Sequence, residues 1–142
     1  MLRYGTLLIA FNFFSLISDG NLLAQTGDFY NVYLDANTLF AKGQFDKAIN
    51  LYNQALKLHQ ADYVYFNRGN CFFGKKDFKN ALSDYNKTLS MNKEYYEAFC
   101  QRGLLKLQTG DVSACDDLKR AARENLKDAS KAVELNCKKQ KK

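Results

Sequence analysis

Few residues of this sequence are of the types that catalyse reactions or bind metals. The cysteines are Cys71, Cys100, Cys115 and Cys137, and His59 is the only histidine. The sequence contains no Cys-x-x-Cys pair, no His-Glu-x-x-His motif and no glycine-rich phosphate loop. One histidine cannot complete a zinc site or a Ser-His or Cys-His nucleophile pair by the ordinary rules for such sites. We therefore expect no enzyme, no metal and no cofactor.

The cysteines themselves permit a disulfide if the chain reaches an oxidising compartment. Cys115 lies about ten residues before an expected turn near Asn125, and Cys137 about twelve residues after it. In an antiparallel helix hairpin these two positions lie at similar heights, so Cys115 and Cys137 are the candidate pair. Cys71 and Cys100 fall at different heights on neighbouring helices and are expected to be buried thiols. Four free thiols are the alternative.

The first 24 residues have the pattern of an export signal. Arg3 precedes an apolar run from Leu7 to Ile17, and Ala24 supplies the small residue at a cleavage site before Gln25. The run is shorter than the roughly 20 residues of a membrane-spanning helix. We predict an exported, periplasmic or envelope-associated protein that is cleaved near Ala24. An uncleaved anchor, or an extra helix packed on the rest of the chain, are the alternatives.

The rest of the chain repeats itself. Residues 45–49 align with residues 78–82 at a step of 33 residues, and Gly69 aligns with Gly103 at a step of 34, which also aligns Ala81 with Cys115. The sequence has no proline, and its apolar residues recur at helical spacing. These periods predict three helix pairs, with first helices at about 30–42, 63–75 and 96–108 and second helices at about 45–58, 78–91 and 112–124.

Each unit has a small residue in its first helix, Gly or Asp at the turn, and then an aromatic, Ala and Tyr in the second helix. In this pattern the chain resembles the tetratricopeptide repeat family. The resemblance implies an all-α α-solenoid with repeats at 29–61, 62–95 and 96–125, an amphipathic capping helix at 126–138 and a basic tail at 139–142. The third unit departs most from the pattern, because Val112 and Lys119 stand where aromatics are expected.

In this family the first helices line a concave face that holds a peptide or a partner helix. Mapped onto this chain, the resemblance implies a peptide-binding face made of Tyr30, Tyr33, Asn37, Phe40, Tyr63, Phe66, Asn70, Phe73 and Leu104, with Glu97, Cys100 and Leu107 beside them. The alternative is that this aromatic stripe is core. Some members grip a carboxylate with Lys and Arg, but Tyr33, Glu97 and Gln101 stand at those positions here, so the resemblance does not imply that activity.

The expected function is therefore a non-catalytic adaptor or assembly factor that binds a protein or peptide partner. The alternative is a protein that associates peripherally with an anionic membrane or polymer through its lysine-rich C-terminus. Four of the lysines behind the net charge of +6 lie within residues 138–142, so no nucleic-acid partner is expected. Self-association through an exposed aromatic face is also open.

Overall fold

A computed structural model describes residues 15–137 of the chain, and residues 1–14 and 138–142, which include the whole predicted basic tail, lie outside that description. Within the described part there are seven helices and no strands. The helices are α1 (Ser15–Ala41), α2 (Phe45–Leu58), α3 (Asp62–Gly74), α4 (Phe78–Met91), α5 (Tyr96–Thr109), α6 (Ala114–Ala122) and α7 (Lys127–Asn136). The all-α prediction is confirmed, and most of the predicted helix ends lie within two residues of those observed.

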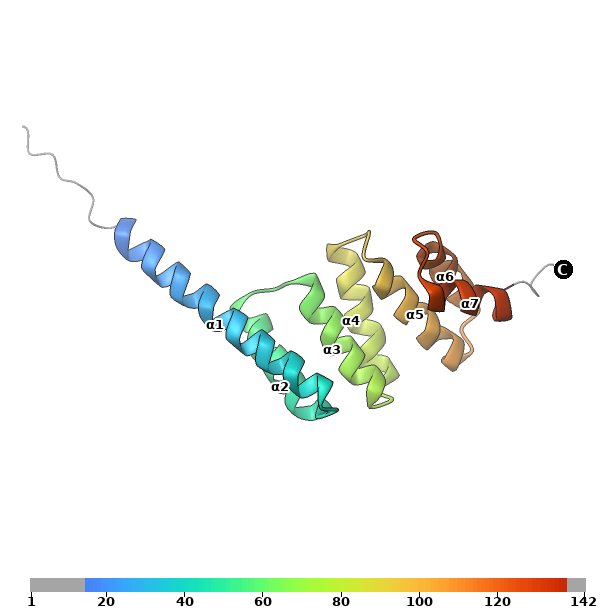
Figure 1. Cartoon of the computed structure of the whole chain (residues 1–142), viewed down its shortest axis with the longest axis horizontal. Coiled ribbons are helices and arrows are strands. Elements are labelled where there is room, and N and C mark those ends of the chain that lie inside the picture. Colours follow the sequence, from blue (N-terminus) through green and yellow to red (C-terminus); the bar gives the residue numbers. More distant parts are fainter. Residues whose placement is uncertain (1–14, 138–142) are drawn as a thin grey trace, which may run out of the picture.

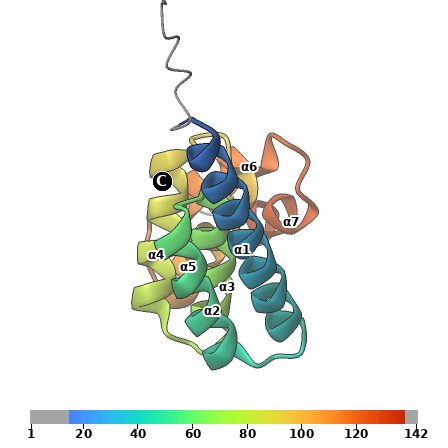
Figure 2. The same ribbon diagram turned by 90° about the vertical axis from the view of Figure 1, so that its left-hand side faces the viewer.

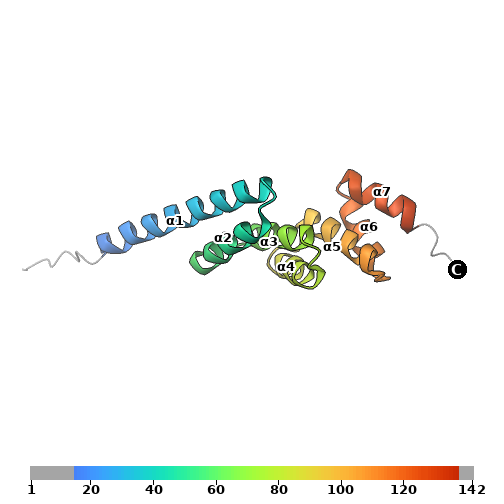
Figure 3. The same ribbon diagram turned by 90° about the horizontal axis from the view of Figure 1, so that it is seen from below.

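The helices form three antiparallel pairs, α1 with α2, α3 with α4 and α5 with α6, stacked side by side along the long axis (Figure 1). Seen along that axis, the helices of the three pairs run roughly alongside one another (Figure 2). In the view from below, α1 and α7 stand at the two ends on the same side, with α3 and α5 between them (Figure 3). This arrangement makes α1, α3, α5 and α7 the inner layer of the array.

The turn inside each pair repeats one backbone hydrogen bond. In each case an amide donates to the carbonyl five residues earlier at 2.9 Å, the donors being Gln44, Asp77 and Asp111. The residue before each donor has a left-handed backbone, at Gly43, Lys76 and Gly110, with φ of 70°, 62° and 74°. This is the geometry that ends a helix while satisfying its last carbonyls. Because all three turns share it, the three pairs bend back in the same way.

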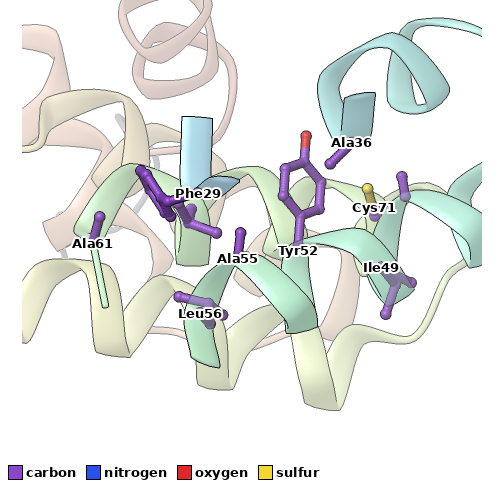
Figure 4. Packing of buried hydrophobic residues seen from close by; sticks show 10 residues of the cluster. Phe29, Ala36, Ile49, Tyr52, Ala55, Leu56, Ala61 and Cys71 are labelled. Atoms are coloured by element: carbon purple, nitrogen blue, oxygen red, sulfur yellow. The ribbon is translucent and has the colours of Figure 1, made fainter. Parts of the chain in front are cut away.

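Close helix contact within the second and third pairs depends on a glycine in the first helix of the pair. A Cβ on Gly69 would lie 2.8 Å from Tyr85 Cε1, and a Cβ on Gly103 would lie 2.7 Å from Leu118 Cγ. Tyr85 is fully buried in this contact, and Tyr52 fills the equivalent place in the first pair opposite Ala36. In the close view, Tyr52 rises from α2 with Ala36 and Cys71 near it (Figure 4).

The third pair has a shortened second helix, which corrects the sequence alignment. Leu118 faces Gly103 as Tyr85 faces Gly69, so the step between the second helices is 33 residues and not 34. Ala114, and not Cys115, therefore occupies the place of Ala81. The alignment from the turn was off by one residue because Ala114 lies three positions after Asp111, whereas Ala81 lies four positions after Asp77. α6 accordingly begins at Ala114 rather than at residue 112.

Helix α1 is longer than the predicted first helix and begins at Ser15. It therefore runs without interruption through Ala24, the predicted cleavage position. Its first turns extend away from the array beyond α2 (Figure 1). The alternative of an extra packed helix also involves residues 1–14, which lie outside the described residues. No helix within residues 15–137 is long and apolar enough to cross a membrane. The apolar run from Leu7 lies mostly outside the described residues, and cleavage near Ala24 stays a prediction.

The last helix, α7, packs on α6 and covers the end of the array. Its buried side chains are Ala129 and Ala132, with Leu126 and Val133 partly buried beside them. Cys137 follows the helix and is joined to Cys115 of α6 in a disulfide that spans 22 residues of sequence. The apolar contacts of α7 are small, so the disulfide is a main constraint holding it in place.

Candidate binding groove

The predicted concave residues divide into a packed group and an open group. Tyr33 and Tyr63 lie ring to ring, with centroids 5.1 Å apart, and both contact the buried Phe29. Phe66 packs against Tyr95 at 4.9 Å. These aromatics join α1 to α3 and α3 to the start of α5. Tyr33, Tyr63 and Phe66 thus pack against the core and are partly buried, so part of each side chain stays exposed. Tyr30, by contrast, is 60% exposed on α1.

Two predicted amides are held by tyrosines of the second helices. Tyr52 Oη donates to Asn37 Oδ1 at 2.7 Å, and Tyr85 Oη donates to Asn70 Oδ1 at 2.9 Å. The two pairs are equivalent in successive repeats. Leu104 takes the place of the asparagine in the third repeat, where Leu118 replaces the tyrosine, so donor and acceptor change together. The bond to Oδ1 fixes which side of the Asn70 amide carries its NH2 group.

An open hollow of about 540 Å³ lies at the turn end of the inner layer. Its lining comes from α1, the first turn, α2, α3 and α5, and consists of Phe40, Ala41, Gly43, Phe45, Asn70, Phe73, Gly74 and Gln101. Three of these residues, Phe40, Asn70 and Phe73, were predicted from the sequence as binding residues. None of the lining residues carries a charge. We call this the aromatic hollow.

Two further hollows continue the inner layer toward the C-terminus. One of about 140 Å³ is lined by Glu97, Cys100, Gln101, Leu126, Lys127 and Asp128. Another of about 330 Å³ lies between α5 and α7 and includes the predicted Leu104 and Leu107. Gln101 lines both the aromatic hollow and the smaller one, and Asp128 lines both of the C-terminal ones. Neighbouring hollows thus share a lining residue, and we call the three hollows together the groove along α3, α5 and α7.

The positions where related domains carry carboxylate-gripping residues form a neutral network here. Asn67 Nδ2 donates to Tyr33 Oη at 3.0 Å and to Asn37 Oδ1 at 3.2 Å. Both hydrogens of this amide are thus used inside the protein. Gln101 and Glu97, at the remaining positions, supply no positive charge. An anionic group placed beside Tyr33, Asn37 and Asn67 would lose water without gaining a cation from these residues, which is costly.

Sequence reasoning missed two polar triads, each built on a buried aspartate, on the side of the first helices that faces the second helices. Arg68 binds Asp84 through two hydrogen bonds of 2.7 and 2.8 Å and donates to Asn53 at 2.6 Å. Among the described residues, Arg68 is the only cation paired with this carboxylate, whose side chain is 6% exposed. The arginine thereby ties together α2, α3 and α4.

The second triad repeats the first one repeat later. Arg102 binds Asp117 at 2.6 and 2.8 Å and donates to Asn86 at 2.6 Å. Lys106 adds a second ion pair to Asp117 at 2.8 Å. The sequence does contain a signal for these triads, because Asn, Arg and Asp recur in both repeats at spacings of about 15 residues. Each of these residues alone, however, is of a type that usually lies on the solvated surface.

The unbridged thiols are poor nucleophiles. Cys71 is fully buried, and burial raises the pKa of its thiol to about 12, with Asp84 adding to the effect. Burial also raises the pKa of Cys100, and the carboxylates of Asp128 and Glu97 add to it. A thiolate is the reactive form of cysteine. Within residues 15–137 no cluster of three His, Cys, Asp or Glu residues is arranged to hold a metal. These groups therefore indicate packing rather than chemistry.

Comparison with known proteins agrees with this geometry. A family model described as TPR repeat matches residues 36–76, and one described as tetratricopeptide repeat matches residues 63–95. The described helices form an all-α array of tetratricopeptide-like repeats. No curated protein matches the chain in sequence.

Solved structures with the same repeat fold cover most of the chain. The Arabidopsis OM64 TPR domain has a TM-score of 0.76 and 24% identity, over 80% of this chain and 98% of that one. The Sgt2 TPR domain from Aspergillus fumigatus has a TM-score of 0.72 and 19% identity, over 79% and 78% of the two chains. The first TPR of Spaghetti (RPAP3), bound to an HSP90 peptide, has a TM-score of 0.73 and 23% identity, over 78% and 90%. At these identities the likeness establishes the fold.

Proposed function

We propose that this chain is a non-catalytic adaptor or assembly factor that holds a segment of another protein in the groove along α3, α5 and α7. The observation that carries the proposal is the aromatic hollow, an open space lined by Phe40, Asn70 and Phe73 of the predicted binding face. Aromatic rings provide large contact area at low entropy cost, and amides fix the direction of a peptide backbone. The structural neighbour that binds an HSP90 peptide supports a peptide-binding role for the same fold.

The proposal includes export to the bacterial periplasm or cell envelope after cleavage near Ala24. Two features of the chain support it: the signal-like pattern of residues 1–24 and the disulfide between Cys115 and Cys137. Disulfides persist in oxidising compartments and are rare in the cytosol. N-terminal sequencing of protein recovered from the envelope fraction tests this part. A chain that starts at Gln25 or within a few residues of it supports export, and a chain that retains Met1 in the cytosol contradicts it.

Site-directed photo-crosslinking in the producing cell tests the binding role. A photoreactive amino acid at Gln101 in the groove is compared with one at Gln54, an exposed residue of α2. We expect products with a partner at position 101 and none of the same products at position 54. The crosslinked partner peptide is then identified by mass spectrometry. Identical products at both positions, or none at Gln101, contradict binding in the groove.

The same experiment separates the groove from the lysine-rich tail. Deleting residues 138–142 is expected to leave the products at Gln101 unchanged. If the deletion removes all partner contact, the tail-driven alternative, in which the chain associates with an anionic membrane or polymer, explains the function better. Binding through a charged tail also weakens steeply with salt, because exposed charges are screened within about 10 Å at 0.1 M.

A further inference from the structure

The aromatic hollow has chemical features that restrict what it can bind. Phe40, Phe45 and Phe73 provide aromatic walls, and the remaining lining residues are small or carry neutral amides. A neighbouring hollow that shares Gly43 and Phe45 is lined by the charged residues Asp46, Lys47 and Lys75, of which Asp46 and Lys75 form an ion pair. A charged side chain that entered the hollow would lose water and gain no countercharge. The hollow is therefore suited to an uncharged group.

Asn70 adds a donor of known direction. Its Oδ1 accepts the hydroxyl hydrogen of the buried Tyr85, so its NH2 group is on the other side of the amide. No hydrogen bond to another described residue occupies that NH2 group, and Asn70 lines the hollow. Gln101 contributes a second amide, which makes no hydrogen bond within the described part of the chain. An acceptor such as a peptide carbonyl matches Asn70, and Gln101 can either donate or accept.

Resting on the groove as a binding site, we propose that the aromatic hollow receives an uncharged aromatic or branched aliphatic side chain of an extended internal segment of a partner protein. The backbone carbonyl beside that anchor accepts a hydrogen bond from Asn70, and the segment continues past Gln101 toward α7. The site recognises an apolar anchor side chain within an uncharged internal segment. It does not read a C-terminal carboxylate, because Tyr33, Asn67 and Gln101 offer no cation and the Asn67 donors are already used.

The groove is also long enough for more than one side chain. The aromatic hollow and the hollow beside Cys100 share Gln101, and together they connect the turn end of α1 with the start of α7. Charges occur only in the C-terminal part, where Glu97 and Asp128 stand beside Lys127 and Lys131. Two carboxylates and two ammonium groups give that part no excess of either sign. Charge therefore adds little to the choice of segment.

Selection from a displayed library of random seven-residue segments tests the proposal on the full, oxidised chain. Half of the library is displayed as internal loops and half with a free C-terminus. We expect enrichment of Phe, Tyr, Leu or Ile at one position in the internal half, with few Asp or Glu residues beside it. Enrichment of acidic segments with a free C-terminus overturns the proposal while leaving groove binding intact. Failure of any segment to be enriched overturns the binding role as well.

The enriched segment is then labelled with fluorescein, and its affinity for the protein is measured by fluorescence anisotropy. Gln101→Ala is expected to weaken binding about fivefold, as for the loss of one neutral hydrogen bond, and the matched Gln54→Ala variant is expected to change it less than twofold. Affinity is expected to change less than twofold between 50 and 500 mM NaCl. Gln101→Arg should improve binding of an acidic C-terminal probe relative to the neutral one. A steep loss of affinity with salt, or equal effects of Gln101→Ala and Gln54→Ala, overturns the proposal.

Discussion

The contact between Gly69 and Tyr85 offers a sharp test of how the helix pairs are held together. In Gly69→Ala the new Cβ would lie 2.8 Å from Tyr85 Cε1 and 3.0 Å from Cδ1, and 3.2 Å from Asp84 Cβ. Carbon atoms pack favourably at about 3.5 to 4.0 Å, so the ring or the helix must shift by several tenths of an ångström. Neither neighbour is free to move, because Tyr85 is fully buried and bonded to Asn70, and Asp84 is held by Arg68.

The expected cost follows from two opposing terms. Overpacking a tight core contact costs about 1 to 3 kcal/mol, and replacing a helical glycine by alanine returns about 1 kcal/mol. The clash has no soft neighbour to relieve it, so we take the upper part of the first range and expect a net loss of about 1 to 2 kcal/mol. For a chain of this size the corresponding fall in Tm is about 3 to 8 °C.

Urea unfolding followed by circular dichroism measures the change, with Gly27→Ala as the matched control. Gly27 is also in a helix, and a Cβ there would meet nothing within 4 Å. The control is expected to be neutral or to stabilise the protein by up to about 1 kcal/mol. A double-mutant cycle with Tyr85→Leu should show coupling between the two sites. If Gly69→Ala is as stable as the control, the close packing described for the second pair is refuted.

Three further predictions concern the disulfide, the buried ion pairs and the free thiols. Replacing both Cys115 and Cys137 by Ser is expected to cost about 3 kcal/mol in the free energy of unfolding, as for a loop of 22 residues. Alkylation of the unchanged protein, denatured without reductant, tests the bridge itself: two alkylated thiols support it and four contradict it. Arg68→Met should destabilise the fold by about 2 to 4 kcal/mol because it leaves a buried carboxylate without a cation, and Arg102→Met should cost less in the same urea titration because a lysine remains. Because the pKa of Cys71 is raised in the folded protein, the folded protein keeps the thiol proton at a pH where the unfolded chain has lost it. The free energy of unfolding, measured by urea titration, should therefore be unaffected by this group below about pH 9 and fall as the pH rises toward 12. A Cys71→Ala variant should lose less stability over that window.

The sequence was sufficient to predict the helices because their signals are local and repeated. The turns at Gly43 and Gly110, the absence of proline and the recurring apolar spacing predicted six of the seven helices to within about two residues, and only α1 begins much earlier than expected. The register of α6 could not be obtained in this way. Ala114 lies one position closer to Asp111 than Ala81 lies to Asp77, and this change leaves the apolar spacing of α5 and α6 intact. Only the contact of Leu118 with Gly103 shows which residue of α6 faces inward.

The candidate site was harder to predict because helical spacing does not separate core from groove. Tyr33 and Phe73 occupy similar inner positions in the sequence pattern. In the structure Tyr33 is packed between Phe29 and Tyr63, and Phe73 lines the aromatic hollow. Whether an inner residue is packed or lines a hollow depends on the side chains of the neighbouring helices that lie opposite it. Those side chains are far away in the sequence, so the local spacing pattern does not predict them. The ion pair of Arg68 with Asp84 was missed for the same reason.

The central claim is that a partner segment lies in the groove of the inner layer, anchored in the aromatic hollow. Amide chemical-shift mapping by NMR tests this most directly, using isotope-labelled protein titrated with the segment selected from the displayed library. Binding in the groove predicts the largest shifts at Phe40, Asn70 and Gln101, and small shifts on the exposed faces of α2 and α4. Shifts concentrated on α2 and α4, or none at saturating peptide, would contradict the account.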